Sequence, residues 1–103
     1  MKVLGNDMII HIALYAWKQE STTEAIDRAI AEVRALKKKV PGLIDVRCGK
    51  NYSKWNEGYT HAFVVLAKDQ KALDDYRNHP DHVKVAGIID KMESKSIGID
   101  FED

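Results

Sequence analysis

The sequence predicts an α+β fold of the ferredoxin-like type, in which a four-stranded antiparallel sheet has helices on one face. The first observation is that four separate stretches have the apolar character or alternation typical of strands. The second is an amphipathic helical repeat after the first of these stretches, and the third is a pair of helix-start signals before the last one. The element order is therefore βαββαβ, with strands expected at 8–17, 43–50, 59–67 and 96–102.

The first expected strand, 8–17, has two different faces, because successive side chains of a strand point to opposite sides of a sheet. The apolar set consists of Met8, Ile10, Ile12, Leu14 and Ala16. The mixed set, which combines apolar with polar and amphipathic side chains, consists of Ile9, His11, Ala13, Tyr15 and Trp17. We expect the apolar face to meet a dry core and the mixed face to border something partly polar.

The segment that follows predicts a helix. Ser21 and Glu24 have the spacing of a capping box at its start, and Pro41 with Gly42 ends it. The lysines at 37–39 complement the negative end of the helix dipole. The apolar stripe expected to pack on the sheet consists of Ile26, Ile30, Val33 and Leu36.

The second half of the chain contains further signals for strands and helices. A polar loop at 51–58 joins the second and third strands into a long hairpin. Asp69 can cap a helix that runs to about Asn78, and Pro80 suits the first position of a further helix. In the third strand one face carries Thr60, Ala62, Val64 and Leu66, and the other carries Tyr59, His61, Phe63 and Val65.

Two helices on one sheet face leave the other face without a cover, and we expect the mixed set to lie on that uncovered face. An uncovered apolar face predicts an interface, and a second copy of the same sheet is the simplest cover. We therefore expect a homodimer whose two sheets enclose a barrel-like core. The residues expected at the dimer interface are Ile9, Trp17, Val65, Ile99 and Phe101.

Composition narrows the classes of function. A chain of 103 residues with 45% apolar and 31% charged residues is typical of one globular domain. Sixteen basic and sixteen acidic residues leave no net field, so neither nucleic acid nor a membrane is an expected partner. Cys48 is the single cysteine, and the N-terminal apolar run is interrupted by Asp7 and His11. We expect a cytoplasmic protein.

The chain resembles the stress-responsive A/B barrel (Dabb) family of dimeric α/β barrels. The resemblance rests on "IIHIALYAW", "VPGLIDVRCGKN", "GYTHAFVV", "LDDYRNHPDHV" and "IGIDFE". The elements G-Y-x-H-A and Y-x-x-H-P-x-H are specific in combination. The resemblance implies one such domain at residues 8–103, after an N-terminal extension at residues 1–7.

The family includes a polyketide cyclase that closes a linear substrate by aldol condensation, as well as stress proteins of no settled activity. The resemblance places the cyclase's working pair on Tyr76 and His82. It implies substrate-binding positions at His11, Ala13, Tyr15, His61, Phe63 and His79. Aromatic side chains at two of these positions would shorten a pocket for an alkyl tail, so the substrate itself does not carry over. The expected ligand is small and aromatic or polyketide-like.

Each of these residues also has a structural interpretation. His79 can cap a helix while His82 is hydrogen-bonded in the wall, and His11 and His61 can be satisfied polar residues that line a cavity. A metal site is disfavoured, because no H-E-x-x-H motif or cysteine pair accompanies the histidines. Trp55 fits equally a lid over the barrel mouth and a packing residue against a partner.

The sequence therefore leaves two classes of function open. One is a cofactor-independent cyclase or lyase that uses Tyr76 and His82, with no metal. The other is a non-catalytic stress or ligand-binding protein in which the histidines support the barrel. A cofactor-free monooxygenase of similar barrel shape is a weaker third candidate, because its match would be one of fold alone.

Overall fold

The structure is a computed structural model that describes residues 8–103. The fold has the predicted α+β class and ferredoxin-like order. Its elements are β1 (Ile9–Trp17), α1 (Thr23–Ala35), a 3₁₀ turn (Leu36–Lys38), β2 (Leu43–Lys50), β3 (His61–Ala67), α2 (Gln70–Asn78), α3 (Pro80–Met92) and β4 (Glu93–Glu102). The extension expected at residues 1–7 lies outside the described part of the chain.

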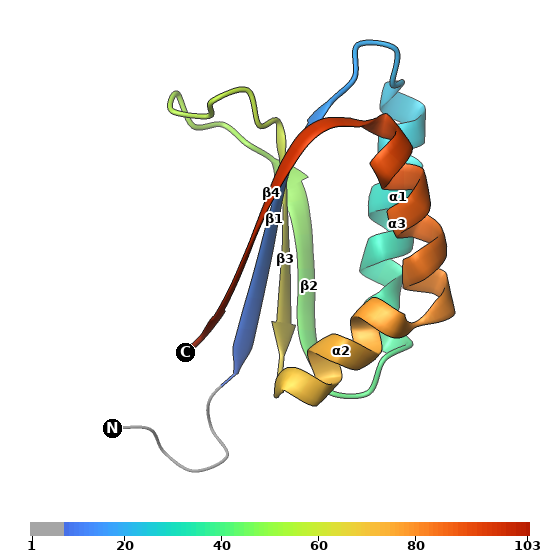
Figure 1. Ribbon diagram of the computed structural model, residues 1–103, viewed down its shortest axis with the longest axis vertical. Coiled ribbons are helices and arrows are strands. Elements are labelled where there is room, and N and C mark those ends of the chain that lie inside the picture. Colours follow the sequence, from blue (N-terminus) through green and yellow to red (C-terminus); the bar gives the residue numbers. More distant parts are fainter. Residues whose placement is uncertain (1–7) are drawn as a thin grey trace.

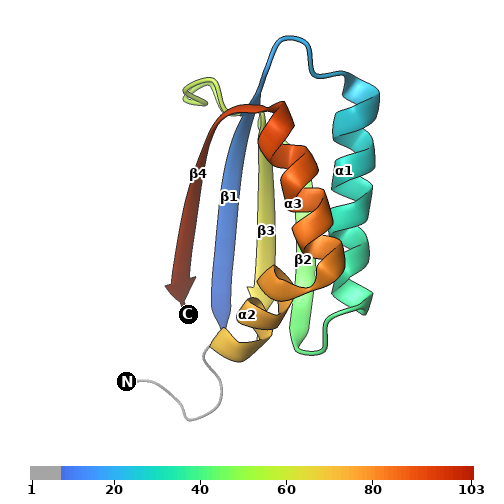
Figure 2. The ribbon, with the colours of Figure 1, turned by 45° about the vertical axis from the view of Figure 1, so that its right-hand side comes forward.

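The four strands form one antiparallel sheet in the order β2-β3-β1-β4. The three helices lie on one side of this sheet, so the protomer has two layers (Figure 1). In the turned view α1 and α3 run along the strands, and α2 crosses below them near the ends of β1 and β3 (Figure 2). No helix formed by residues 8–103 lies over the opposite side of the sheet, as the sequence predicts.

The start of α1 differs from the expected capping box. Thr22, not Ser21, is the N-cap, and its hydroxyl accepts a hydrogen bond from the backbone N–H of Ala25 at 3.1 Å. The Ser21 hydroxyl donates instead to the carbonyl oxygen of Met92 at 3.0 Å. The capping-box prediction is wrong because Ser21 connects this turn to the end of α3, which leaves the adjacent threonine to satisfy the helix N-terminus.

The assignment of the two sheet faces is also wrong. The mixed face lies under the helices: Val65 has no exposed surface, Ile9 is 6% exposed and Phe63 is 3% exposed. Trp17 and Tyr15 are partly buried and pack against the same core. The expectation that Ile9, Trp17 and Val65 lie on an uncovered face fails, since strand alternation shows that two faces differ but does not show which one receives the helices.

The uncovered face carries the purely apolar set. Its rows run across three strands in hydrogen-bonded register: Ile10 with Leu66 and Phe101, Ile12 with Val64 and Ile99, and Leu14 with Ala62 and Ile97. We call these residues the outer face. Ile99 is 47% exposed and Phe101 is 43% exposed in the single protomer, so both lie on the open side as expected. An uncovered apolar surface is therefore present, but it is built from the opposite set of side chains.

The loop between β2 and β3 projects to the side of the sheet away from the helices (Figure 1). It carries Tyr52, 93% exposed, and Trp55, 77% exposed. The ring of Trp55 is contacted by the ammonium group of Lys54, at 4.5 Å from the ring centroid. Because of its direction, the loop extends on the side of the outer face and does not cover the space under the helices.

Candidate functional site

The corner between α2 and α3 brings Tyr76 and His82 together. α2 ends at Asn78, His79 has an extended backbone with φ −62° and ψ 134°, and α3 begins at Pro80. Proline at this position has no N–H to lose and its fixed φ suits a first helical turn. The redirected chain places the two rings 4.4 Å apart between centroids, with their planes tilted by 53°.

The imidazole of His82 is held in one tautomer. Its Nδ1 lies 3.0 Å from the carbonyl oxygen of Arg77, which can only accept, so Nδ1 must carry the proton. Burial lowers the pKa of His82 below its ordinary value of 6.5. The ring is therefore neutral near pH 7, and Nε2 is the nitrogen with a lone pair. A neutral imidazole oriented in this way is a general base.

The phenol of Tyr76 is kept protonated beside that base. Tyr76 is 3% exposed, and burial raises its pKa well above the usual value, with smaller contributions from Cys48 and Tyr15. Among the described residues, its hydroxyl has no hydrogen-bond partner. The pair thus combines a proton acceptor, His82, with a donor that does not ionise near neutral pH.

A charged cluster of side chains from β1, α2 and β4 lies next to this pair. His11 Nδ1 lies 2.6 Å from Asp100 Oδ1, and Arg77 Nη2 lies 2.7 Å from Asp100 Oδ2. The same Nη2 atom is 3.3 Å from His11 Nδ1. Burial acts to raise the pKa of Asp100, but the hydrogen bonds from Arg77 and His11 outweigh it and the pKa is lowered. The carboxylate of Asp100 therefore accepts one hydrogen bond from Arg77 and one from His11.

The other end of the covered face is aromatic. Tyr15 and Trp17 stack at 5.3 Å between ring centroids, and Tyr15 meets Phe63 edge to face at 5.1 Å. The indole N–H of Trp17 donates to His61 Nδ1 at 2.9 Å, so His61 is neutral with its proton on Nε2. Burial, and then the charge of Lys50, lower the pKa of His61. Burial raises the pKa of Tyr15 to about 12.

The predicted site residues are placed unevenly. His11 and His61 share the covered face with Ala13 and Phe63, but they occupy different ends: His11 pairs with Val65 across the strands, and His61 pairs with Tyr15. The expectation that these side chains line a cavity between two sheets is wrong, because helices cover them within one protomer.

His79 caps α3, since its Nδ1 accepts from the backbone N–H of Asp81 at 3.1 Å. This is the structural interpretation of that residue. The backbone N–H of His79 donates to the carbonyl oxygen of Tyr76 at 3.3 Å. No hydrogen bond or ring contact among the described residues joins the His79 imidazole to the Tyr76–His82 pair, so the structure gives no support to its expected place in a substrate site.

Sequence reasoning missed Arg77 and Asp100. The signal for Asp100 was available, because it lies opposite His11 in the register of β1 and β4 and so shares its face. Arg77 directly follows Tyr76 and looked like an ordinary charge in the last turn of a helix. Its backbone carbonyl orients His82 while its side chain reaches Asp100, and neither contact can be read from spacing.

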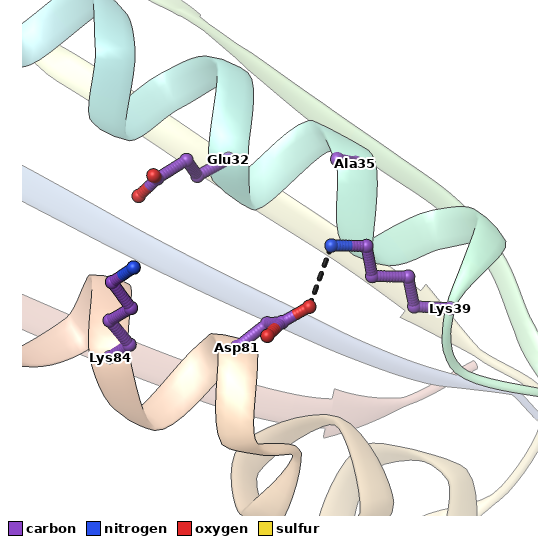
Figure 3. A pocket seen from close by; sticks show the side chains of 5 residues that line it. All are labelled: Glu32, Ala35, Lys39, Asp81 and Lys84. Atoms are coloured by element: carbon purple, nitrogen blue, oxygen red, sulfur yellow. Dashed lines mark hydrogen bonds and ion pairs between the residues drawn. The ribbon is translucent and has the colours of Figure 1, made fainter.

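A second surface feature lies between α1 and α3, with the strands behind the helices (Figure 3). This groove of about 180 Å³ is lined by Glu32, Ala35, Lys39, Asp81 and Lys84. Lys39 Nζ and Asp81 Oδ2 form an ion pair at 2.6 Å, so their charges compensate each other. These are half-exposed charges of a helix pair, and the groove is separate from the Tyr76–His82 pair.

Within residues 8–103, no three His, Cys, Asp or Glu side chains are grouped so that they could hold a metal ion. In the same part of the chain, no helix has the length and apolar character needed to cross a membrane.

The comparison with known families decides the relationship. The model of the Stress Responsive A/B Barrel Domain matches residues 9–103. The chain belongs to the stress-responsive A/B barrel domain family. The resemblance inferred from the sequence motifs is thus confirmed over nearly the whole described chain.

Individual proteins and solved structures give further comparisons. Olivetolic acid cyclase of Cannabis sativa is 27% identical over 93 residues, which cover 88% of this chain and 92% of the cyclase. A dimeric ferredoxin-like protein from Thermobifida fusca has a TM-score of 0.81 and 25% identity, with 93% of this chain and 91% of that chain covered. Hydroxynitrile lyase from Passiflora edulis has a TM-score of 0.87 with 95% and 94% covered, but at 17% identity it shows the fold alone.

Proposed function

We propose that this protein binds a small carbonyl compound under its helices and transfers a proton at the carbon next to the carbonyl group, without a cofactor. The observation that carries the proposal is the Tyr76–His82 pair, with ring centroids 4.4 Å apart. His82 is a neutral base of fixed tautomer, and Tyr76 is a protonated donor. The similarity to a cyclase of the same family supports this kind of chemistry.

The proposed reaction begins when His82 Nε2 removes a proton from the α-carbon. The electron pair of the broken C–H bond forms the carbon–carbon double bond of an enolate, and charge develops on the carbonyl oxygen. The Tyr76 hydroxyl donates a hydrogen bond to that oxygen. A general base contributes roughly 10²–10⁴-fold to such a step, and one oxyanion donor about 10²–10³-fold.

In a cyclase, the enolate carbon would attack a second carbonyl carbon of the same molecule. A carbon–carbon bond forms, the second oxygen becomes an alkoxide, and protonated His82 returns its proton to that oxygen. This aldol addition uses His82 twice, first as the base and then as the acid, and balances without any other reactant; loss of water from the adduct would complete the condensation. The stacked pair Tyr15 and Trp17 limits the length of substrate that fits beside it.

The experiment uses acetophenone, a compact aromatic ketone, and follows exchange of its methyl protons in D₂O by NMR. The wild-type protein should accelerate exchange, and Tyr76→Phe and His82→Gln should each lower the acceleration by about 100-fold or more. The double variant should accelerate exchange only slightly less than the less active of the two single variants. Tyr52→Phe is the matched control, because Tyr52 is 93% exposed on the distant loop. Exchange at the background rate in the wild type contradicts the catalytic proposal.

A non-catalytic role is the second candidate, and the corner itself favours it. The cap made by His79 and the bond from His82 to the carbonyl of Arg77 are contacts that a purely structural histidine corner needs. In this case His82→Gln should lower the melting temperature, while wild-type protein and variant show the same background exchange of acetophenone.

The assembly that we propose is a homodimer formed through the outer face. Its apolar rows would be covered by the same rows of a second copy, as an isologous interface requires. The description of the Thermobifida fusca relative as dimeric supports a dimer; the exposed apolar rows support the outer face as its interface. In such a dimer the two Tyr76–His82 sites lie on the far sides of the paired sheets, one in each protomer.

A further inference from the structure

The β2–β3 loop, residues 51–60, presents two large aromatic side chains to solvent. Trp55 is 77% exposed and Tyr52 is 93% exposed. A single exposed apolar residue is ordinary, but these two share one loop, and that loop stands on the same side of the sheet as the apolar outer face (Figure 1). The exposed aromatic surface is therefore continuous in direction with the surface through which we propose that the protein dimerises.

The shape of this loop is fixed by its own polar side chains. Asn51 Oδ1 accepts from the backbone N–H of Ser53 at 3.0 Å, and Ser53 Oγ accepts from the backbone N–H of Trp55 at 3.0 Å. Asn56 Nδ2 donates to the carbonyl oxygen of Ser53 at 3.0 Å, and Asn56 Oδ1 accepts from the backbone N–H of Gly58 at 2.8 Å. The backbone that carries Trp55 is thus ordered before any partner binds, which lowers the entropic cost of binding one.

The loop is also fastened to two strands of the sheet. The backbone N–H of Thr60 donates to the carbonyl oxygen of Tyr15 on β1 at 2.9 Å. On β4, the ammonium group of Lys95 donates to the carbonyl oxygen of Glu57 and lies 4.4 Å from the ring centroid of Tyr59. These contacts hold the loop at one end of the sheet. Its projection to the side away from the helices is therefore a fixed direction (Figure 1).

We propose that Trp55 of each protomer packs against the partner protomer at the rim of the paired outer faces. The inference rests on the proposed homodimer and specifies a contact that only the dimer can make. Sheets packed face to face lie about 10 Å apart, so a loop that projects from the rim of one sheet reaches the other. A twofold axis makes the contact twice, once from each loop.

The surface area involved is large enough to matter for a dimer. Two tryptophan side chains exposed to this degree remove roughly 250–400 Å² from water when both are covered. A stable interface between two proteins of ordinary size buries about 1,600 Å² in total. The two copies of Trp55 thus supply a substantial part of the interface, and preordered tryptophans are the residue type that most often dominates binding energy.

The direction of the loop decides between the two roles that the sequence left open for Trp55. A lid over the space under the helices would have to lie on the side of Tyr76 and His82, and the loop projects to the opposite side (Figure 1). A packing residue against a second copy agrees with this direction. A contact with a different protein would leave Trp55 exposed in the dimer, so the test below separates that case.

The first measurement is the accessibility of Trp55 to acrylamide, a neutral quencher of fluorescence. The emission of Trp55 is the difference between wild type and Trp55→Phe, because Trp17 is the other tryptophan. The quenching constant of Trp55 should be at least about threefold lower in the wild-type dimer than in Ile99→Asp, because a packed interface excludes solvent from its aromatic anchors. Wild type diluted below its dissociation constant supplies the monomer if Ile99→Asp does not fold.

The second measurement is the dissociation constant of the dimer, obtained by sedimentation. Trp55→Ser should raise it by about 30-fold or more, as truncation of a tryptophan anchor does at other interfaces. Val83→Ser is the matched control for loss of an exposed apolar side chain. Val83 is 60% exposed on α3, on the helical side of the sheet, so this variant should change the constant by less than about twofold.

The outcomes separate the inference from the dimer on which it rests. A wild-type dimer in which Trp55 is quenched as readily as in the monomer overturns the inference and leaves the dimer standing. A Trp55→Ser dimer as tight as the wild type has the same meaning. A wild-type protein that sediments as a monomer at micromolar concentration removes the proposed dimer and the inference together.

Discussion

Val65→Asp and Ile99→Asp introduce the same carboxylate on opposite faces of the sheet and should have opposite consequences. Val65 has no exposed surface under the helices. An unpaired buried charge costs about 3–5 kcal/mol, and the lost burial of the valine side chain adds about 1.5–3 kcal/mol. The sum, about 5–8 kcal/mol, is comparable with the roughly 5–15 kcal/mol that keeps a domain of this size folded. Val65→Asp should therefore unfold the protein.

Ile99 is already 47% exposed on the outer face, so in the single protomer the aspartate loses only about 1 kcal/mol of apolar burial. In the proposed dimer the same carboxylate would lie between two apolar sheets. Ile99→Asp should thus keep its helical circular dichroism and sediment as a monomer at micromolar concentration, where the wild type sediments as a dimer. A folded Val65→Asp protein, or an Ile99→Asp protein that stays dimeric, refutes the assignment of the two faces.

Three other predictions follow from local geometry. Burial lowers the pKa of both His61 and His82, so each takes up a proton on unfolding below about pH 6.5. The free energy of unfolding should therefore be highest above that pH and should decrease as the pH falls below it. Each histidine contributes a slope of up to about 1.4 kcal/mol per pH unit, and urea unfolding at several pH values should show a shallower decline in His82→Gln; an equal decline contradicts the reasoning. Gly42→Ala should lower the free energy of unfolding by at least about 1–2 kcal/mol, since Gly42 has φ +89° and a new Cβ would lie 2.8 Å from the Cβ of Ala72, and an unchanged denaturation midpoint would rule this out. Thr22→Ala should cost about 1 kcal/mol by the same measurement, because it removes the N-cap of α1, and a neutral result would show that solvent replaces the cap.

The sequence predicted many of the residues at the candidate site but not how their side chains are arranged in space. Tyr76 and His82 were predicted as a pair, and the extended backbone of His79 provides the bend between α2 and α3 that brings their rings together. The tautomer of His82 was not predictable, because it depends on a contact with a backbone carbonyl.

Arg77 and Asp100 lie far apart along the chain, and nothing in their local sequence distinguishes them from ordinary surface charges. Their contact exists because the side chain of Arg77, at the end of α2, reaches Asp100 on β4. Trp17 was expected at a dimer interface, yet it donates to His61 under the helices. These roles come from the packing of α2 and of the strands, which spacing in the sequence does not encode.

The sequence by itself determined the order of the elements, the boundaries of the strands to within a few residues and the family. These follow from local rules: alternation in strands, an apolar stripe in α1, and Asp69 and Pro80 at helix starts. It also determined that the sheet has two unlike faces. Only the tertiary structure decided which face the helices cover, because that depends on the hand of the crossovers and on the pleat of each strand at once. As a result, His11 and His61 lie under the helices of one protomer and not in the expected dimer cavity. The apolar rows around Ile12 form the uncovered surface instead.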